Sequence, residues 1–231
     1  MLIRVGIEHN IEARTLAWAL DFPGCFAYGA DEAEALLQLP YNLLQFDYWV
    51  RLHTDQPWFE LGNMDFHIDE SFETFEVPFK QEPYIVNAFF KDDLRPLTVE
   101  ETEQALQVFT WQHQELLAGI EFADPAQLDL IKEGEHWSIL GILRHLACAE
   151  VWYLQVLGIE AQPPNEELSA VEKIEYSYQL VLEKLPKLTE SEVVTKFSEE
   201  SWTARKFVRR LLWHRRVHID HIKKLLGVSV K

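Results

Sequence analysis

Three histidines occupy positions from which they could share one metal ion. His214 and His218 are four residues apart in WHRRVHIDHI, and His145 lies in ILRHLACAEVW. At about 100° of rotation per residue, His214 and His218 fall within about 40° of each other on the helix that this segment predicts. The same stripe carries the apolar residues Phe207, Leu211, Ile222 and Leu225. We therefore expect two imidazoles that face the core side by side, a spacing suited to one ion.

His145 has a comparable setting. It shares a helix face with Ser138, Gly141, Ala149, Trp152 and Val156, several of them small enough to leave room around the imidazole. A buried imidazole needs a polar partner, and a metal ion is a suitable one. Three histidines from two helices, with further coordination positions open to water, are typical of a catalytic metal site and not of a closed structural one.

The alternative is that these histidines are structural. A histidine that faces the core is more often a hydrogen-bonded core residue than a ligand, so this interpretation stays open. We interpret His113 and His221 as structural, and His113 as the fourth ligand if there is one. The remaining histidines are expected on the surface or in loops; they are His9, His53, His67 and His136.

Neighbouring residues exclude some other kinds of site. A zinc protease helix has Glu directly after the first histidine of its pair, where this chain has Arg215. Glu150 lies about 140° from His145 on the helix, so we do not expect it to be a ligand. Cys148 is interpreted as a small buried thiol that fills space. No glycine-rich phosphate loop, nucleophile elbow or dinucleotide fingerprint occurs.

Four amphipathic segments should position these histidines. Two begin with a capping box, Thr98 with Glu101 and Ser169 with Glu172, in which side chains satisfy the first free amides of a helix. Four helices, each with one apolar stripe, predict a four-helix bundle. We expect the helices at residues 98–118, 138–158 and 169–185 and, for the last, from near Ser201-Trp202-Thr203 up to Gly227.

The chain before residue 96 has a different pattern. Short alternating apolar runs predict strands, and Asp31 is expected to cap a helix through AEALLQL that Pro40 interrupts or ends. The expected strands are Leu2–Ile7, Leu16–Leu20, Phe66–Phe75 and Tyr84–Phe90. We therefore predict an α+β domain at residues 1–95 and an all-α four-helix bundle at residues 96–231.

Composition limits the functional classes. The 231 residues are 48% hydrophobic, enough for a substantial core, yet contain no apolar stretch of eighteen residues that would span a membrane. The start of the chain does not have the pattern of a signal peptide. The two cysteines are far apart in the sequence, so we expect no disulfide framework and a cytoplasmic location.

The formal charge of −17 opposes nucleic-acid binding, which needs a cationic surface. Residues 1–95 carry 6 basic and 17 acidic residues, and the rest of the chain carries 15 and 21. A group of basic residues precedes and follows the histidine pair: Arg205, Lys206, Arg209, Arg210, Arg215 and Arg216. We interpret most of this group as the solvent-exposed face of the last helix.

Residues 97–228 resemble the DinB-like family of metal-binding four-helix bundles. The resemblance is carried by WSILGILRHLACAEVWYL and WTARKFVRRLLWHRRVHIDHI. The family has one histidine in the second helix and an HxxxH pair in the fourth, and these correspond to His145, His214 and His218. It implies a long crossover between helices two and three, here residues 158–168, and a homodimer. Recognised members include S-transferases that use low-molecular-weight bacterial thiols, while many members have no known reaction.

A shorter resemblance concerns the first domain. LDFPGCFAYGADEAEALLQL is similar to HicB-type antitoxin domains, over about residues 2–45. HicB proteins usually carry a DNA-binding segment, and we find none in this sequence. The alternative is an accessory domain that packs on the bundle or mediates assembly.

The leading hypothesis is a divalent-metal-dependent enzyme, such as a thiol S-transferase acting on a small-molecule substrate. Zinc or nickel is the expected ion, and iron or manganese also accepts imidazole ligands. A metal-dependent hydrolase is the nearest alternative. From another class comes a non-catalytic stress-response module, in which the acidic first domain binds a basic protein.

Overall fold

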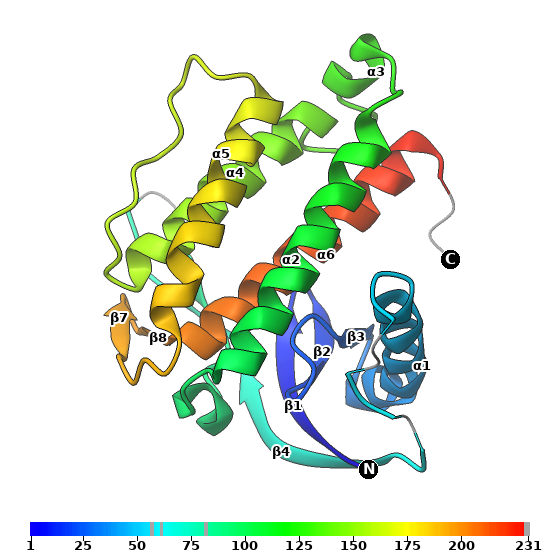
Figure 1. Cartoon of the computed structure of the whole chain (residues 1–231), viewed down its shortest axis with the longest axis vertical. Coiled ribbons are helices and arrows are strands. Elements are labelled where there is room, and N and C mark those ends of the chain that lie inside the picture. The colour runs from blue at the N-terminus through cyan, green and yellow to red at the C-terminus, as the bar shows by residue number, and fades with distance from the viewer. Residues whose placement is uncertain (56–57, 61, 81–82, 229–231) are drawn as a thin grey trace. The chain divides into compact units, whose positions relative to one another are not determined.

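The computed structural model describes residues 1–55, 58–60, 62–80 and 83–228 (Figure 1). The chain divides into two compact units. The sheet unit contains Met1–Arg95 and Val194–Lys206, and the bundle unit contains Pro96–Val193 and Phe207–Lys231. The N-terminal part of the sheet unit ends at Arg95. Residues 194–206 differ from expectation, because they group with the first part of the chain.

A four-stranded sheet forms the centre of the sheet unit. Its strands are β1 (Leu2–Ile11), β2 (Arg14–Ala19), β3 (Phe26–Gly29) and β4 (Asp65–Glu73), in the order β3-β2-β1-β4. The first three run antiparallel to their neighbours, and β4 pairs parallel to β1. Helix α1 (Glu32–Arg51) provides the connection that a parallel pair requires. The expected α+β class is confirmed.

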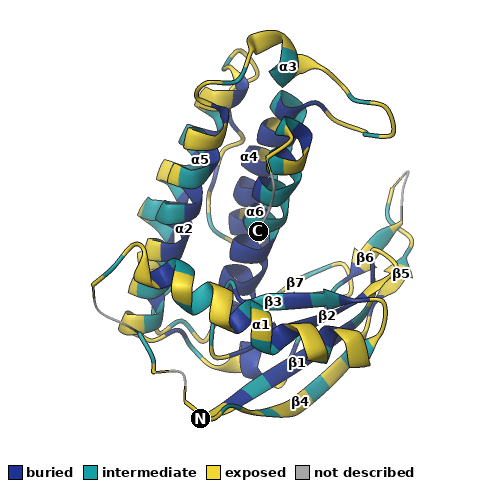
Figure 2. Ribbon diagram, turned by 90° about the vertical axis from the view of Figure 1, so that its right-hand side faces the viewer, coloured by how far each residue is buried: buried dark blue, intermediate teal, exposed yellow. Residues whose placement is uncertain are grey.

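Helix α1 covers one face of this sheet (Figure 2). Alternate residues of β1 point to it, as a strand with period two requires, and they are Ile3, Val5 and Ile7. The helix contributes Ala35, Leu39 and Leu43, each one turn apart. Asp31 caps α1 as expected, and Pro40 lies inside the helix without ending it.

The opposite face of the sheet packs against the segment that follows β6 (Tyr84–Val86). A Cβ atom on Gly6 would lie 2.7 Å from the ring of Phe90, so a residue without a side chain allows this approach. Glu8 is buried on β1 and accepts hydrogen bonds from Trp18 Nε1 at 2.9 Å and from the Ala88 amide at 2.8 Å. Each carboxylate oxygen therefore has a donor.

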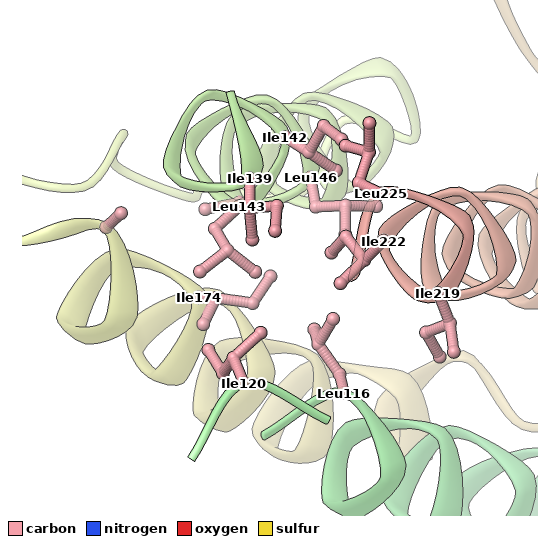
Figure 3. Packing of buried hydrophobic residues seen from close by; sticks show 12 residues of the cluster. Leu116, Ile120, Ile139, Ile142, Leu143, Leu146, Ile174, Ile219, Ile222 and Leu225 are labelled. Atoms are coloured by element: carbon pink, nitrogen blue, oxygen red, sulfur yellow. The ribbon is translucent and has the colours of Figure 1, made fainter. Parts of the chain in front are cut away.

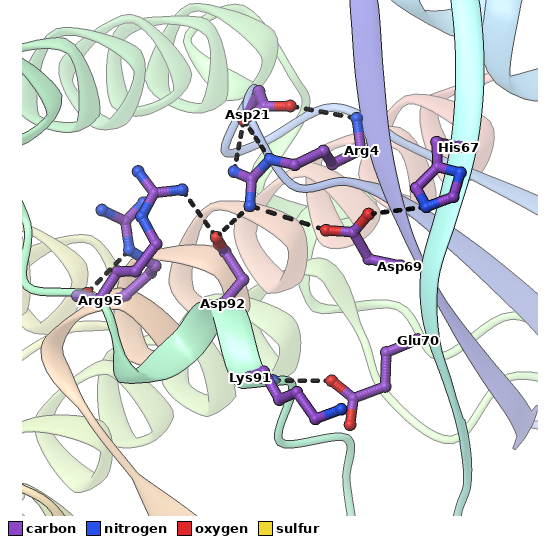
Figure 4. Close-up of polar contacts among 9 residues, drawn as sticks. Arg4, Asp21, His67, Asp69, Glu70, Lys91, Asp92 and Arg95 are labelled. Atoms are coloured by element: carbon purple, nitrogen blue, oxygen red, sulfur yellow. Dashed lines mark hydrogen bonds and ion pairs between the residues drawn. The ribbon is translucent and has the colours of Figure 1, made fainter.

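Arg4 connects several elements of the sheet unit (Figure 4). Its guanidinium donates to Asp21, and at 2.7 Å to Asp92 in the short helix η1 (Lys91–Leu94). It also pairs with Asp69 of β4 at 3.7 Å. One cation thereby lies within ion-pair distance of three carboxylates in this acidic unit, and Arg95 also pairs with Asp92.

Two hairpins complete the sheet unit. β5 (Phe75–Val77) pairs with β6, and β7 (Thr195–Phe197) pairs with β8 (Glu200–Trp202). The strand expected at Phe66–Phe75 is therefore divided between β4 and β5. Ser201 and Trp202, expected at the start of the last helix, belong to β8, and α6 (Ala204–Leu226) begins directly after them.

Four long helices of the bundle unit share one apolar core (Figure 3). They are α2 (Val99–Ile120), α4 (Ile139–Val156), α5 (Ala170–Lys184) and α6. Both expected capping boxes are present, at Thr98 and at Ser169, and Ser138 caps α4. The sequence did not indicate the short helices α3 (Pro125–Asp129) and η2 (Leu185–Leu188).

The connection between α4 and α5 covers residues 157–169 and returns along the length of the bundle (Figure 1). Consequently α4 and α5 run in the same direction. Leu116, Ile142 and Ile222 illustrate the packing, because each comes from a different helix and each is almost completely buried. None of the described helices is both long and apolar enough to cross a membrane.

The expectation that the basic residues of α6 form a solvent-exposed face is wrong. Lys206 and Arg215 are completely buried. Arg205, Arg209 and Arg210 are each only 5% exposed. The physical reason is pairing with groups distant in the sequence. Lys206 Nζ lies 2.6 Å from Glu200, and Arg205 Nε donates to the Arg95 carbonyl at 2.9 Å.

Candidate metal centre

The three predicted ligands converge in the bundle unit. Nε2 of His214 lies 3.0 Å from Nε2 of His145 and 3.1 Å from Nε2 of His218. The rings are steeply inclined to one another, with interplanar angles of 67–86°, so they diverge from the point where their nitrogens meet. Within the described part of the chain, no other group of three or more His, Cys, Asp or Glu side chains converges in this way.

Helix geometry explains the convergence. His214 and His218 are one turn apart on α6, and the apolar residues of their stripe orient that face to the bundle core. His145 lies two turns after the Ser138 cap of α4, where Ser138 Oγ accepts a hydrogen bond from the Gly141 amide at 3.1 Å. Two rigid helices therefore fix the positions of all three imidazoles.

The short contacts among the three Nε2 atoms cannot all be hydrogen bonds. A neutral imidazole has one N–H and one lone pair, so two Nε2 atoms can form one hydrogen bond only if they are in different tautomers. His214 Nε2 carries either one hydrogen or one lone pair, so it can form a full hydrogen bond with only one of its two neighbours. A cation at the meeting point accepts all three lone pairs at once.

The spacing also suits a divalent ion. Donors held about 2.0–2.1 Å from one zinc lie about 2.9 Å apart at right angles and about 3.3 Å apart at tetrahedral angles. The two contacts of 3.0 and 3.1 Å fall between these values, and all three nitrogens lie within 4.8 Å of one another. The residues present therefore fit a metal ion, without a preference between the two geometries.

Burial keeps the imidazoles neutral. It lowers the pKa of His218 to about 3, an effect to which His145 and His221 add. Burial lowers the pKa of His145 as well, and it lowers that of His214 well below its ordinary value, together with repulsion from His218 and His145. At neutral pH all three rings are therefore in the form that binds metal.

The other nitrogens of two of these rings are also unusual. Nδ1 of His214 and Nδ1 of His218 are buried and have no hydrogen-bond partner among the described residues. Buried polar atoms without a partner are uncommon in folded proteins and destabilise the fold. An ion held by Nε2 would leave the ring hydrogen on each Nδ1, so it would not supply these two atoms with a partner.

The remaining core histidines have partners within the protein, as expected for structural residues. His113 Nε2 lies 2.9 Å from Glu175, and its ring stacks on Tyr178 with the centroids 3.8 Å apart. His221 Nε2 lies 2.8 Å from Glu135. Neither belongs to the converging group.

Glu150 and Cys148 have different outcomes. Glu150 is buried and holds Arg215 through hydrogen bonds from Nε and from a terminal nitrogen, each 2.8 Å long, so it is engaged elsewhere, as expected for a residue that is not a ligand. Cys148 is exposed, and its interpretation as a buried thiol is wrong. It follows His145 by three residues and lies on the solvent side of α4.

Aromatic residues adjoin the cluster in a way the sequence did not reveal. Trp137 is 43% exposed and stacks on His145, with centroids 4.6 Å apart. Gly141 allows this, because a Cβ there would lie 3.1 Å from Trp137 Cβ, so the room expected beside His145 is partly filled. Tyr153 meets His214 edge to face at 6.0 Å. The signal for Trp137 was its position directly before the helix cap.

Comparisons with known proteins give only distant similarities. No family model matches the chain, and no curated protein matches it. YfiT from Bacillus subtilis, described as a probable metal-dependent hydrolase with an unusual four-helix bundle topology, is 21% identical. Its TM-score is 0.44, with 58% of this chain and 91% of that chain covered.

A second solved structure, TT2238, is described as a four-helix bundle protein. It is also 21% identical with a TM-score of 0.44, over 53% of this chain and 98% of the other. Similarities at this level say nothing about the chemistry of this chain. The expected resemblance of residues 2–45 to HicB domains has no support from these comparisons.

Proposed function

We propose that this chain binds one divalent metal ion through Nε2 of His145, His214 and His218, and that it uses the ion to activate a small nucleophile. The observation that carries this proposal is the approach of three neutral imidazole nitrogens to one point at 3.0 and 3.1 Å. Zinc or nickel is the leading expectation, and iron or manganese is compatible with the same ligands.

The ligand set defines the chemistry. A divalent ion held by three neutral ligands keeps its full positive charge and open positions, so it lowers the pKa of a bound water or thiol. Trp137 covers one side of His145 and shields it from water. Tyr153 restricts the space beside His214. A substrate would therefore approach from a direction that these rings leave open.

A low-molecular-weight thiol is the proposed nucleophile. This choice rests on the resemblance of residues 97–228 to DinB-like bundles, among which are thiol S-transferases. The thiolate sulfur would attack an electrophilic carbon of a small molecule, forming the carbon–sulfur bond. The leaving group would depart with its bonding electrons, and the thiol proton would pass to solvent. Both cysteines of the chain are free, which suits the reducing cytoplasm proposed for such a reaction.

Metal-assisted hydrolysis is the second candidate, favoured by one observation. His221 and Glu135 form a hydrogen-bonded pair at 2.8 Å, and the His221 ring stacks beside that of His218 with centroids 6.4 Å apart. Such a pair offers a hydrogen-bonding group next to the cluster, where an attacking water would be oriented.

Cobalt substitution tests both candidates. The visible spectrum of the cobalt-loaded protein should change on addition of a small thiol, and turnover of an electrophile should require that thiol. Hydrolysis predicts turnover without thiol. His145→Ala should lose the spectrum, and His113→Ala, a core histidine outside the cluster, should keep it. A cobalt spectrum that no thiol alters, with no turnover of either kind, would support the non-catalytic alternative.

A further inference from the structure

Helix α1 carries an apolar stripe on its solvent side. Leu37 is 77% exposed, Tyr41 55%, Leu44 49% and Tyr48 62%. Their spacing of four, three and four residues places all of them on one face, and Figure 2 shows exposed segments along this helix. We call this set of four residues the outer stripe.

The outer stripe lies opposite the face of α1 that packs on the sheet. Ala35, Leu39 and Leu43 fill the core beneath the helix, so α1 is apolar on two sides and the sheet uses one. Single exposed apolar residues are ordinary, but four in a continuous row on one helix mark a contact surface. The spacing is that of the a and d positions of a coiled-coil seam, with tyrosine at a and leucine at d.

Charges close both ends of the outer stripe. Continuing the same heptad pattern, Glu34 takes the next a position before Leu37, and Arg51 takes the next d position after Tyr48. Both residues are exposed, and each also has a contact in its own chain: Glu34 accepts a hydrogen bond from the Ala30 amide at 2.7 Å, and Arg51 Nε donates to Asp47 at 2.9 Å. In chain order, the a and d positions are therefore occupied by Glu34, Leu37, Tyr41, Leu44, Tyr48 and Arg51.

We propose that the outer stripe is the contact between two copies of this chain, with the two α1 helices antiparallel. In such a pairing each a position faces a d position of the other helix. Leu37 then faces the partner's Tyr48, and Tyr41 faces the partner's Leu44. At both ends Glu34 faces the partner's Arg51. One register satisfies every position of the row.

The antiparallel arrangement follows from charge and symmetry. A two-fold axis brings the same surface of both copies together, so the surface must complement itself. A parallel pair would place Glu34 against the partner's Glu34 and Arg51 against the partner's Arg51. The antiparallel pair opposes unlike charges, and it also opposes the helix dipoles favourably. In a chain of net charge −17, a surface whose own charges compensate is where two copies can meet.

The size of the contact sets its strength. From Glu34 to Arg51 the seam extends for about 26 Å of helix, and a single helix pair of this length is a small interface. We therefore expect a reversible dimer, whose population depends on protein concentration.

Sedimentation of the full-length chain over a wide concentration range tests this proposal. The parent should shift from monomer to dimer, and Leu44→Glu should weaken dimerisation by about tenfold or more, since it places two charges at the centre of the seam. Phe122→Glu is the matched control, because Phe122 is 90% exposed and lies outside α1. Circular dichroism would verify that both variants are folded. A parent that is monomeric at every concentration, or equal effects of the two substitutions, would overturn the proposal.

Charge reversal tests the antiparallel register. Glu34→Arg alone and Arg51→Glu alone should each weaken the dimer, because each opposes like charges at both ends. The double variant should recover most of the parent affinity. A double variant weaker than either single variant would contradict this register.

Discussion

Two consecutive residues of α6 illustrate opposite ways of burying a polar side chain. Arg215 is completely buried, and two hydrogen bonds of 2.8 Å join it to Glu150, which also accepts one from Ser177 at 2.7 Å. Beside it, the His214 ring nitrogen meets two other ring nitrogens, and its second nitrogen has no partner among the described residues. In the first arrangement the protein itself supplies the opposite charge, although Arg215 Nη1 has no hydrogen-bond partner among the described residues. In the second, three ring nitrogens face one another with no carboxylate of the described residues among them.

His113 shows that the difference does not lie in histidine itself. It is buried, Glu175 lies 2.9 Å from its Nε2, and Tyr178 stacks on the ring. A core histidine with a carboxylate partner is a structural residue. The three clustered histidines have no carboxylate partner in the described part of the chain, and this is the difference on which the proposed metal site depends. Position on an apolar stripe alone does not distinguish the two.

The largest expected effect on stability comes from breaking the buried Glu150–Arg215 pair. Glu150→Ala leaves the Arg215 charge buried and uncompensated, and it should lower the free energy of unfolding by about 3–5 kcal/mol. Chemical denaturation of the metal-free protein measures this. Glu183→Ala is the control, since Glu183 pairs with Lys187 and both side chains are exposed, so its loss should lower the free energy of unfolding far less. Equal losses in the two variants would contradict the distinction.

The second-largest expected effect is the stabilisation of the fold by metal bound to the three clustered histidines. At a free metal concentration of about one hundred times the dissociation constant, binding should raise the free energy of unfolding by about 2.7 kcal/mol. A chelator should remove this increment. His214→Ala should lack it, whereas Glu150→Ala should retain it on a lower baseline. An increment that persists in His214→Ala would place the metal elsewhere.

The third-largest expected effect is on how the free energy of unfolding depends on pH, compared between the parent and His113→Gln. Burial, aided by the nearby Arg215 charge, lowers the pKa of His113 to about 4. Unfolding exposes a histidine that takes up a proton below about pH 6.5. The contribution of neutral His113 is therefore present above that pH and is lost as the pH falls to about 4. The slope is about 1.4 kcal/mol per pH unit.

Denaturation of the metal-free protein between pH 7 and pH 5 measures this slope. His113→Gln should have a shallower slope, because it lacks the contribution of one histidine. His145, His214 and His218 should still contribute to the slope of the variant. An unchanged slope in His113→Gln would mean that His113 is protonated in the folded protein.

The smallest expected effect is on the stability of His218→Leu, and unlike Glu150→Ala this variant should not be destabilised. His218→Leu removes a nitrogen that faces other nitrogens and a buried Nδ1 without a partner. We expect the metal-free variant to be as stable as the parent, or more stable by up to about 1 kcal/mol, and to bind no metal. Thermal and chemical unfolding of both forms provide the comparison. A loss of more than about 2 kcal/mol would show that the ring stabilises the fold.

The features predicted correctly from the sequence depend on local periodicity. The turn between His214 and His218, and the capping boxes at Thr98 and Ser169, are set by residues three or four positions apart. These rules identified the four helices and brought the three histidines to the core. The stripe on which His145 lies followed from the same projection.

The features that were missed depend on partners distant in the chain. The partners of Lys206 and Arg215 are Glu200 and Glu150, and a helical projection cannot distinguish a buried paired cation from an exposed one. Position in the chain also did not indicate that residues 194–206 group with the sheet unit. Trp137 lies outside the helix, so its stacking on His145 depends on the direction in which the chain enters α4.

Metal stoichiometry, measured by elemental analysis after loading and desalting, tests the central claim most directly. The parent should retain one divalent ion per chain, and so should His113→Ala. His145→Ala, His214→Ala and His218→Ala should each retain none while remaining folded by circular dichroism. An equal metal content in the parent and the three triad variants, or no metal in the parent after incubation with zinc and nickel, would contradict the account.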